Sequence, residues 1–218
     1  MVYGLNVRPE WGFDPKRDWE GRDEPARRIP ALNPVDDGGV VWDSHHSGVP
    51  VDGANFPKWV RWADPNDNPV PDFDSVPYLN VSETAKQVIE SLEAGVHQFF
   101  PVDYQDLKGQ HTGLRYWFVP CHRIDSVDRD HTNMVLRKGL EWCPAKDMLR
   151  RGEPIPDNVD PSKPARLVFN LAAIGDRHIW RDKHMSSSQY ISDTMASLFL
   201  QEGLTGLRLD ERSRAEAV

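Results

Sequence analysis

Three residues in the stretch WDSHHSG, namely Asp43, His45 and His46, are of the types that bind metal ions or act in acid–base catalysis. Imidazole and carboxylate groups both ligate transition metals, but adjacent histidines rarely point at one ion, and no third and fourth ligands stand out nearby. The patterns HEXXH, paired CXXC, GXSXG and a glycine-rich phosphate loop do not occur in the sequence. We therefore expect a polar loop here, with no metal and no cofactor. A small enzyme that uses His45, His46 or Cys121 is the alternative.

The two cysteines, Cys121 and Cys143, are too few for a small secreted scaffold held together by disulfides. Cys121 is followed directly by His122, so the two side chains could in principle supply a thiolate and its base. Neighbouring side chains in a strand point to opposite faces, however, and their adjacency argues against such a pair. We expect two free, largely buried thiols.

Two serines, Ser82 and Ser192, stand in similar phrases, each followed by an acidic residue and a threonine. A serine at the start of a helix accepts a hydrogen bond from an N–H group left free in the first turn, and an acidic residue after it suits the helix dipole. Glycines at positions 95 and 203 are suited to end these helices in a left-handed conformation. The phrases predict two capped helices, not catalytic serines. Their buried faces are predicted to contain Ala85, Val88, Ile89 and Leu92 in the first, and Met195, Leu198 and Phe199 in the second.

Most of the sequence between these helices favours strands. VHQFFPV predicts one strand, which Pro101 ends or places at a sheet edge. The aromatic run 116–119 predicts a buried strand that continues to Ile124 and Val127, whereas 144–164 is a polar, proline-rich excursion. ARLVFNLAAI and RHIWRD predict two more strands, separated by a turn at Gly175. The predicted fold class is α+β, a mainly antiparallel sheet with two principal helices packed on it and a loop-rich N-terminal layer.

The first third of the chain has a different composition. Residues 1–77 contain 11 of the 18 prolines and five of the eight tryptophans, which predicts an irregular layer that packs its aromatic residues on an α+β domain at 78–218. VVWDS, at 40–44, predicts a short strand, and 63–77 is the best linker candidate. No signal peptide or membrane-spanning stretch is recognisable, so we expect a cytoplasmic protein that does not bind a membrane.

Charge is also uneven. Of the formal net charge of −8, residues 1–77 carry −6, with 14 acidic and 8 basic residues. This sign disfavours nucleic-acid binding and suits a basic protein partner. The aspartates of this segment most simply make turns. Alternatively they form an acidic rim around tryptophan anchors, although the tryptophans could equally hold the N-terminal layer on the core. The candidate binding residues are Trp59, Trp62, Asp64, Asp67, Asp72 and Asp74.

The order of motifs over about residues 78–210 resembles a known family. A serine-capped helix is followed by FFPV, by RYWFV with IDSVD, by a strand pair ending in HIWRD, and by SDTMASLFLQEGLTGLRLDE. This order is similar to that of an immunity-protein family of bacterial polymorphic toxin systems, formerly a domain of unknown function. Members share a helix that is opened by Ser-Asp and followed by a GLTGL strand, and they share FFPV-like and hIfR-like strands. The last of these is matched here by residues 178–181.

The resemblance implies a cytoplasmic antidote made beside a toxin that a contact-dependent system, such as type VI secretion, delivers. The antidote would bind that cognate toxin and block its active site or its activation, without catalysis of its own. No motif of the family matches residues 1–77.

Overall fold

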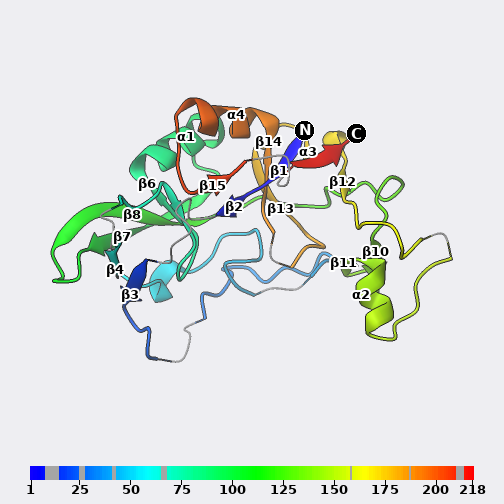
Figure 1. Cartoon of the computed structure of the whole chain (residues 1–218), viewed down its shortest axis with the longest axis horizontal. Coiled ribbons are helices and arrows are strands. Elements are labelled where there is room, and N and C mark those ends of the chain that lie inside the picture. The colour runs from blue at the N-terminus through cyan, green and yellow to red at the C-terminus, as the bar shows by residue number, and fades with distance from the viewer. Residues whose placement is uncertain are drawn as a thin grey trace.

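The computed structural model describes residues 1–7, 15–24, 28–40, 43–64, 68–157, 159–186, 188–209 and 214–218. Within these ranges the chain forms two six-stranded sheets and two short two-stranded ladders, together with four α-helices (Figure 1). Two of the helices, α1 and α4, lie side by side over one side of the sheets. The predicted α+β class, mostly sheet and mainly antiparallel, is confirmed.

The first sheet, which we call the terminal sheet, contains both ends of the chain. Its strand order is β12-β16-β1-β14-β13-β9, and β1 pairs antiparallel with both β14 and β16. The β12–β16 and β9–β13 pairs are parallel. The strands are β1 (Val2–Gly4), β9 (Arg123–Ile124), β12 (Val168–Phe169), β13 (Ile179–Asp182), β14 (Tyr190–Ser192) and β16 (Arg214–Ala217).

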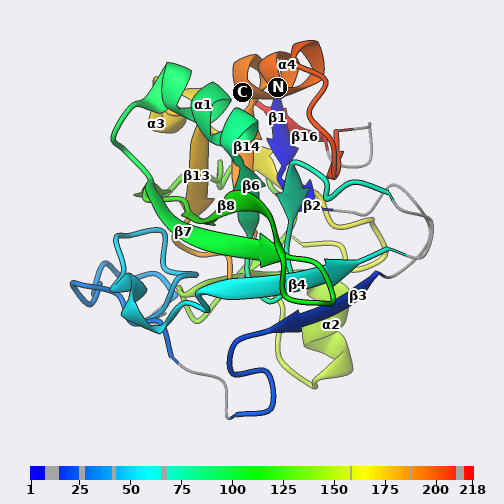
Figure 2. The same ribbon diagram turned by 90° about the vertical axis from the view of Figure 1, so that its left-hand side faces the viewer.

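The second sheet, which we call the hairpin sheet, is built around the long β7–β8 hairpin, with strand order β3-β4-β7-β8-β6-β5 (Figure 2). Its strands are β3 (Lys16–Trp19), β4 (Trp59–Ala63), β5 (Phe73–Asp74), β6 (Asn80–Ser82), β7 (Gln98–Gln105) and β8 (His111–Val119). Pro101 does not end β7. Along β7, only Asp103–Gln105 pair with β4, so Pro101 lies where that side of β7 is a sheet edge. Its missing N–H therefore costs no ladder bond.

The two serine-capped helices are present as predicted. Ser82 Oγ accepts from the N–H of Ala85, at 3.1 Å, at the start of α1 (Glu83–Glu93), and Ser192 Oγ accepts from Met195, at 3.1 Å, at the start of α4 (Asp193–Gln201). Gly95 and Gly203 follow the helices with φ of 71° and 65°. The helices pack on each other and on both sheets through a core that contains Ala85, Val88, Ile89, Met195, Ala196 and Phe199.

One helical position was predicted wrongly. Leu92 was placed on the buried face of α1, but it is 37% exposed, whereas its neighbour Glu93 is buried at 6%. The helix is rotated so that the Glu93 carboxylate faces the start of β13, where two backbone N–H groups donate hydrogen bonds to it. A hydrogen-bonded carboxylate therefore takes the place that the apolar pattern assigned to a leucine.

Two strand predictions also need correction. In ARLVFNLAAI only Val168–Phe169 is a strand, because the Asn170 side chain caps a short helix, α3 (Leu171–Ile174), by accepting from Ala173 N. Ile124 does not continue β8. It belongs to β9 in the terminal sheet, so the chain crosses between the sheets after Pro120. The excursion at 144–164 begins with α2 (Ala145–Arg150).

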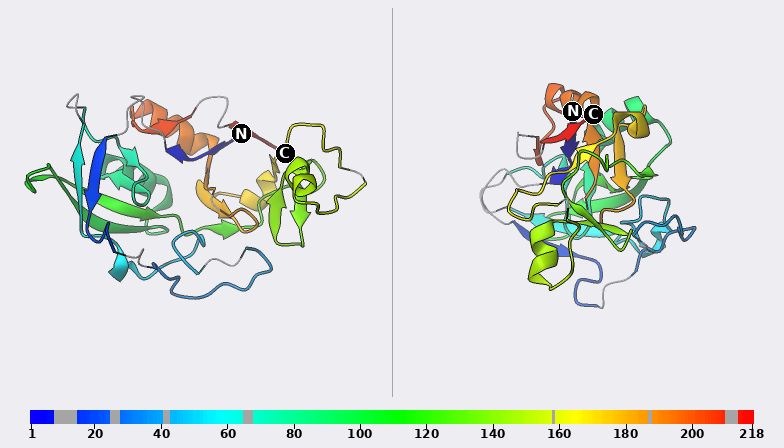
Figure 3. Two further views of the ribbon diagram at one scale, coloured as in Figure 1. Left: turned by 60° about the horizontal axis from the view of Figure 1, so that its bottom comes forward. Right: turned by 90° about the vertical axis from the view of Figure 1, so that its right-hand side faces the viewer.

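The remaining pieces lie at the periphery. α2 and the ladder of β10 (Val135–Arg137) and β11 (Glu141–Cys143) form one end of the molecule, away from the hairpin sheet (Figure 3). The second ladder joins β2 (Asn6–Val7) to β15 (Leu207–Arg208), and a 3₁₀ turn spans Gly53–Asn55.

The first 77 residues contribute strands to both sheets as well as long loops. β1 lies in the terminal sheet and β3 to β5 in the hairpin sheet, with β5 inside the segment predicted as a linker. Of the strand predicted at 40–44, Val41 and Trp42 lie outside the described residues. Among the described residues, no helix is both long and apolar enough to cross a membrane.

Candidate functional site

The histidine pair is packed among aromatic rings. The rings of His45 and His46 lie 3.9 Å apart, and His45 meets Tyr78 edge-on at 4.8 Å. Burial, together with the positive charge of Arg181, lowers the pKa of His45 to about 3 and that of His46 to about 4. Both rings are therefore neutral near pH 7. No group of three or more potential metal ligands comes together in the described parts of the chain.

Cys121 is a protonated thiol at neutral pH. Burial raises its pKa to about 11, and its Sγ donates to the carbonyl oxygen of Val119 at 3.2 Å. Its backbone N–H donates to His97 Nδ1 at 3.0 Å. The thiolate, not the thiol, is the nucleophile, so this environment suppresses its reactivity. Cys121 and Cys143 are both free, as predicted.

The histidine that follows Cys121 is oriented toward a carboxylate. Glu93 Oε2 accepts from His97 Nε2 at 2.8 Å, and His122 Nε2 lies 3.2 Å from Oε1. Glu93 also accepts from the backbone N–H groups of His178, at 2.8 Å, and Ile179, at 3.0 Å. Burial alone would raise the pKa of Glu93, but these hydrogen bonds lower it to about 2. A single carboxylate thus joins α1 and the segment that follows β8 to the terminal sheet.

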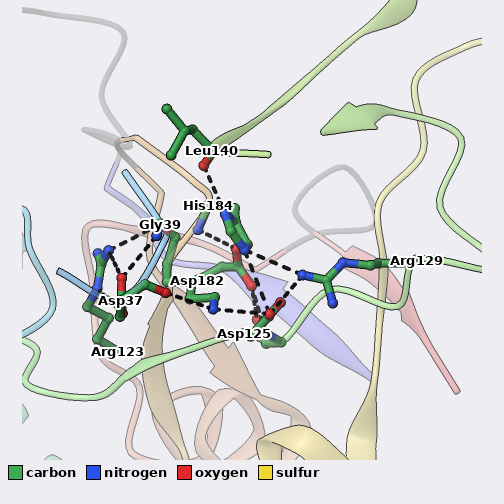
Figure 4. Close-up of polar contacts among 10 residues, drawn as sticks. Asp37, Gly39, Arg123, Asp125, Arg129, Leu140, Asp182 and His184 are labelled. Atoms are coloured by element: carbon green, nitrogen blue, oxygen red, sulfur yellow. Dashed lines mark hydrogen bonds and ion pairs between the residues drawn. The ribbon is translucent and has the colours of Figure 1, made fainter. Parts of the chain in front are cut away.

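A second polar cluster fixes the N-terminal loops (Figure 4). Arg123 donates to both carboxylate oxygens of Asp37 at 2.9 Å, and also to the carbonyl oxygens of Val40 and Ser47 at 2.9 and 3.2 Å. The guanidinium holds the pKa of the Asp37 carboxyl below its usual range. Gly39 is buried beside it, and a Cβ there would lie 2.7 Å from Arg123 Nη2.

The same view shows two further carboxylates. Asp182 accepts from Ser126 through both N–H and Oγ, at 2.7 and 2.8 Å, and from the N–H of His184 at 2.8 Å (Figure 4). Asp125 accepts from Arg129 at 2.8 Å, with Lys183 Nζ at 3.3 Å. Burial raises the pKa of Asp182. Because these carboxylates accept from their own loops, the cluster holds the connections of the terminal sheet together.

The tryptophans predicted to bind a partner differ in exposure. Trp62 is only 8% exposed and belongs to the core between the N-terminal loops and the hairpin sheet, with the Arg17 guanidinium 4.8 Å from its ring. Trp59 is half-buried, and the guanidinium carbon of Arg61 lies 4.6 Å from the centre of its ring. One edge of the hairpin sheet is thus held together by aromatic rings under arginines.

The predicted aspartates are engaged within the fold. Asp74 is buried and pairs with Arg17 at 3.0 Å, while Asp64 is 8% exposed and accepts from Asn68 at 3.1 Å. Asp72 accepts from Ser82 Oγ at 2.6 Å and from Thr205 N and Oγ1 at 2.9 Å. Burial raises the pKa of Asp72, but these bonds outweigh it and hold the pKa below its ordinary range. Asp67 lies outside the described residues.

The model of an immunity protein family, Imm11, matches residues 21–213 of the sequence. The chain belongs to the Imm11 immunity protein family. The resemblance drawn from the motif order over about 78–210 is thereby confirmed, and the match reaches upstream to include β4 and β5. A comparison with curated proteins gives no match.

In this Imm11 protein Trp62, one of the candidate binding residues, lines a groove. The groove, of about 420 Å³, is lined by Trp62, Val70, Tyr104 and Leu114 among others, where the 68–70 segment meets the start of β8. A larger hollow of about 790 Å³ is lined by the residues of β3 and by Leu107, among others. Leu107 and Leu114 are 59% and 49% exposed. We call this end of the hairpin sheet the groove face; Figure 2 has this end of the molecule toward the viewer.

Sequence reasoning missed most of the polar clusters. Glu93 stands at the end of a helix, where a surface position is the usual expectation, and Asp125 and Asp182 lie in motifs interpreted only as strands. One signal could have pointed to Asp182. In RHIWRD two charged residues follow Ile179 and Trp180 in a strand, so at least one of them must lie on a face that the apolar residues bury.

Proposed function

We propose that this Imm11 protein is a cytoplasmic antidote that binds a cognate antibacterial toxin of a polymorphic toxin system and blocks its active site or its activation. The observation that carries the proposal is the family match over residues 21–213, which contains most strands of both sheets and the α1–α4 pair. An antidote of this kind works by contact, so its function resides in a surface and not in a reacting group.

The chemistry of the alternative site residues favours binding over catalysis. Cys121 is a hydrogen-bonded thiol with a raised pKa, and His45 and His46 are neutral rings packed among aromatic residues. A general base works best with a pKa near the operating pH, and both histidine values lie far below it. These residues have structural roles that account for their burial.

We place the toxin contact on the groove face. Interface energy concentrates in apolar anchors at the centre of a contact, and here a buried tryptophan forms the wall of a groove beside exposed Leu114. Addition of a toxin strand to the edge of β3 is disfavoured, because the carbonyl oxygen of Arg17 already accepts from Arg22 Nη1 at 2.7 Å. The toxin would therefore insert an apolar side chain into the groove. Asp64 and Asp72, which lie near it, and Trp59 would act mainly by holding its walls.

The functional test is co-expression with the toxin encoded beside this protein. Cells should survive only when both are made, and the two proteins should elute together in size-exclusion chromatography. Equal killing with and without this protein, together with no complex in chromatography, would refute the proposal.

A Leu114→Asp variant tests the surface. A charge that must lose its water at the centre of an interface should weaken toxin binding at least about 10-fold. Leu200→Asp is the matched control, because Leu200 is 64% exposed on α4, and its variant should bind as the unchanged protein does. If both variants bind the toxin equally well in calorimetry, the contact lies elsewhere, even if the antidote function stands.

A further inference from the structure

Arg181 carries a buried charge that its surroundings satisfy only in part. It lies on β13 and is 4% exposed. Its Nη2 donates to Gln189 Oε1 at 2.5 Å, whereas Nε and Nη1 have no acceptor among the described residues. A guanidinium has five N–H donors and remains protonated in proteins, so most of the donors of Arg181 are left without partners. Leaving such donors buried and unpaired is costly.

Other buried arginines of this chain have more acceptors for their guanidinium N–H groups. Arg17 pairs with Asp74 at 3.0 Å, and Arg115 donates to Asn80 Oδ1 at 2.8 Å and to the Asp72 carbonyl oxygen at 3.0 Å. Arg123, opposite Arg181 in the parallel β9–β13 ladder, has the Asp37 carboxylate. Arg181 makes no salt bridge with a described carboxylate, and burial alone lowers its pKa, to about 10. It is therefore positively charged at neutral pH, and it has neither the carboxylate partner of Arg17 and Arg123 nor the second oxygen acceptor of Arg115.

The segment 43–48 lies over this charge. Gly48, at φ 74°, is so close that a Cβ there would lie 3.1 Å from the Cβ atoms of both Arg123 and Arg181. The segment is held down by the bond from Arg123 to the Ser47 carbonyl oxygen and by the contact of His45 with Tyr78. The positive charge of Arg181 contributes to the lowered pKa of both His45 and His46, so the two rings lie near it. Because both rings are neutral, they do not balance its charge.

We propose that Arg181 binds a small oxyanion, of the size of phosphate or a simple carboxylate, beneath the 43–48 segment. The planar guanidinium fork matches the paired oxygens of such anions, which it binds in short, charge-assisted hydrogen bonds. Bound there, the anion supplies the missing counter-charge and joins β13 of the terminal sheet to the N-terminal segment that covers it. The site is separate from the groove face, so it is a structural ligand site in addition to toxin binding.

Thermal unfolding in phosphate, sulfate or acetate, at constant ionic strength against chloride, tests this site. An oxyanion at about 100 times its Kd should raise the Tm by about 5 to 10 °C. An Arg181→Met variant should lose this rise. The Arg115→Met variant is the matched control: it removes another buried guanidinium that has partners, and it should keep the rise despite a lower starting Tm.

A measurement on the unchanged protein keeps the proposal falsifiable if Arg181→Met does not fold. The phosphorus NMR signal of inorganic phosphate should broaden on addition of the protein and sharpen again when excess sulfate competes. A rise with phosphate and sulfate alone indicates a tetrahedral anion, whereas a rise that includes acetate indicates a site that also accepts carboxylates. If none of the three anions raises the Tm above chloride and the NMR signal stays sharp, or if Arg181→Met responds as the unchanged protein does, the site is refuted.

Discussion

A Glu93→Gln variant should lose about 3 kcal/mol of folding free energy near pH 7, and the loss should shrink in acid. In the folded protein the Glu93 carboxylate accepts four hydrogen bonds. Two come from the backbone N–H groups of His178 and Ile179, at the start of β13, and two come from the rings of His97 and His122. His97 Nδ1 accepts from Cys121 N–H, so Nε2 must carry the proton that points at Glu93. A glutamine would present its NH₂ group to some of these donors and leave them unsatisfied.

The size of the effect follows from the pKa of Glu93. That pKa is about 2 in the folded chain against an ordinary value of 4.5. At 1.36 kcal/mol per unit, this difference stabilises the fold by about 3 kcal/mol at neutral pH. The lowered pKa means that the stabilisation is complete above the unfolded value and is lost as the pH falls through the folded one. At about pH 3 it has decreased to roughly 1.4 kcal/mol, because the unfolded chain is then already protonated.

Urea unfolding of both proteins from about pH 7 to about pH 3 measures this difference. Glu90→Gln is the matched control. Glu90 lies on the same helix and is 38% exposed, at 3.8 Å from Lys86, so its replacement should cost less than about 0.5 kcal/mol at every pH. A cost of Glu93→Gln below about 1 kcal/mol near pH 7, or a cost that does not change with pH, would contradict this role of the Glu93 carboxylate.

Three further predictions concern other contacts. Gly39→Ala should destabilise the protein by about 1 to 3 kcal/mol in thermal unfolding, because the added Cβ would overlap the Lys183 carbonyl oxygen. Gly113→Ala is the control: there is open space around its Cβ, so the stability should change by less than about 0.5 kcal/mol. Equal effects of the two variants would contradict the packing at Gly39. Cys121 should react with iodoacetamide about 100-fold more slowly in the folded than in the unfolded protein near pH 8, because its pKa is raised from 9.0 to about 11, and peptide mapping that finds equal rates would contradict this environment. Ser192→Ala should cost about 1 kcal/mol in urea unfolding through loss of the α4 cap, and an unchanged midpoint would show that the cap does not contribute.

The parts of the structure that could be predicted are those set by near neighbours in the chain. Ser82 and Ser192 meet N–H groups three residues on, and the glycines that end the helices need a positive φ whatever surrounds them. The Ala85–Val88–Ile89 stripe follows from helical spacing alone. Short-range geometry of this kind is written in the local sequence, and so are the strands of the β7–β8 hairpin and β13.

Only the tertiary structure decided which polar residues are buried and paired. Glu93 meets Ile179 of β13 across 86 residues of chain, Arg123 meets Asp37 across 86, and Asp72 meets Thr205 across 133. No local pattern encodes such pairs, because each exists only once two sheets and the loops between them have been brought together. The same holds for the candidate binding residues. Composition singled out Trp62 and its neighbouring aspartates, but the packing of the hairpin sheet placed the tryptophan in the wall of a groove and turned Asp74 inward, toward Arg17.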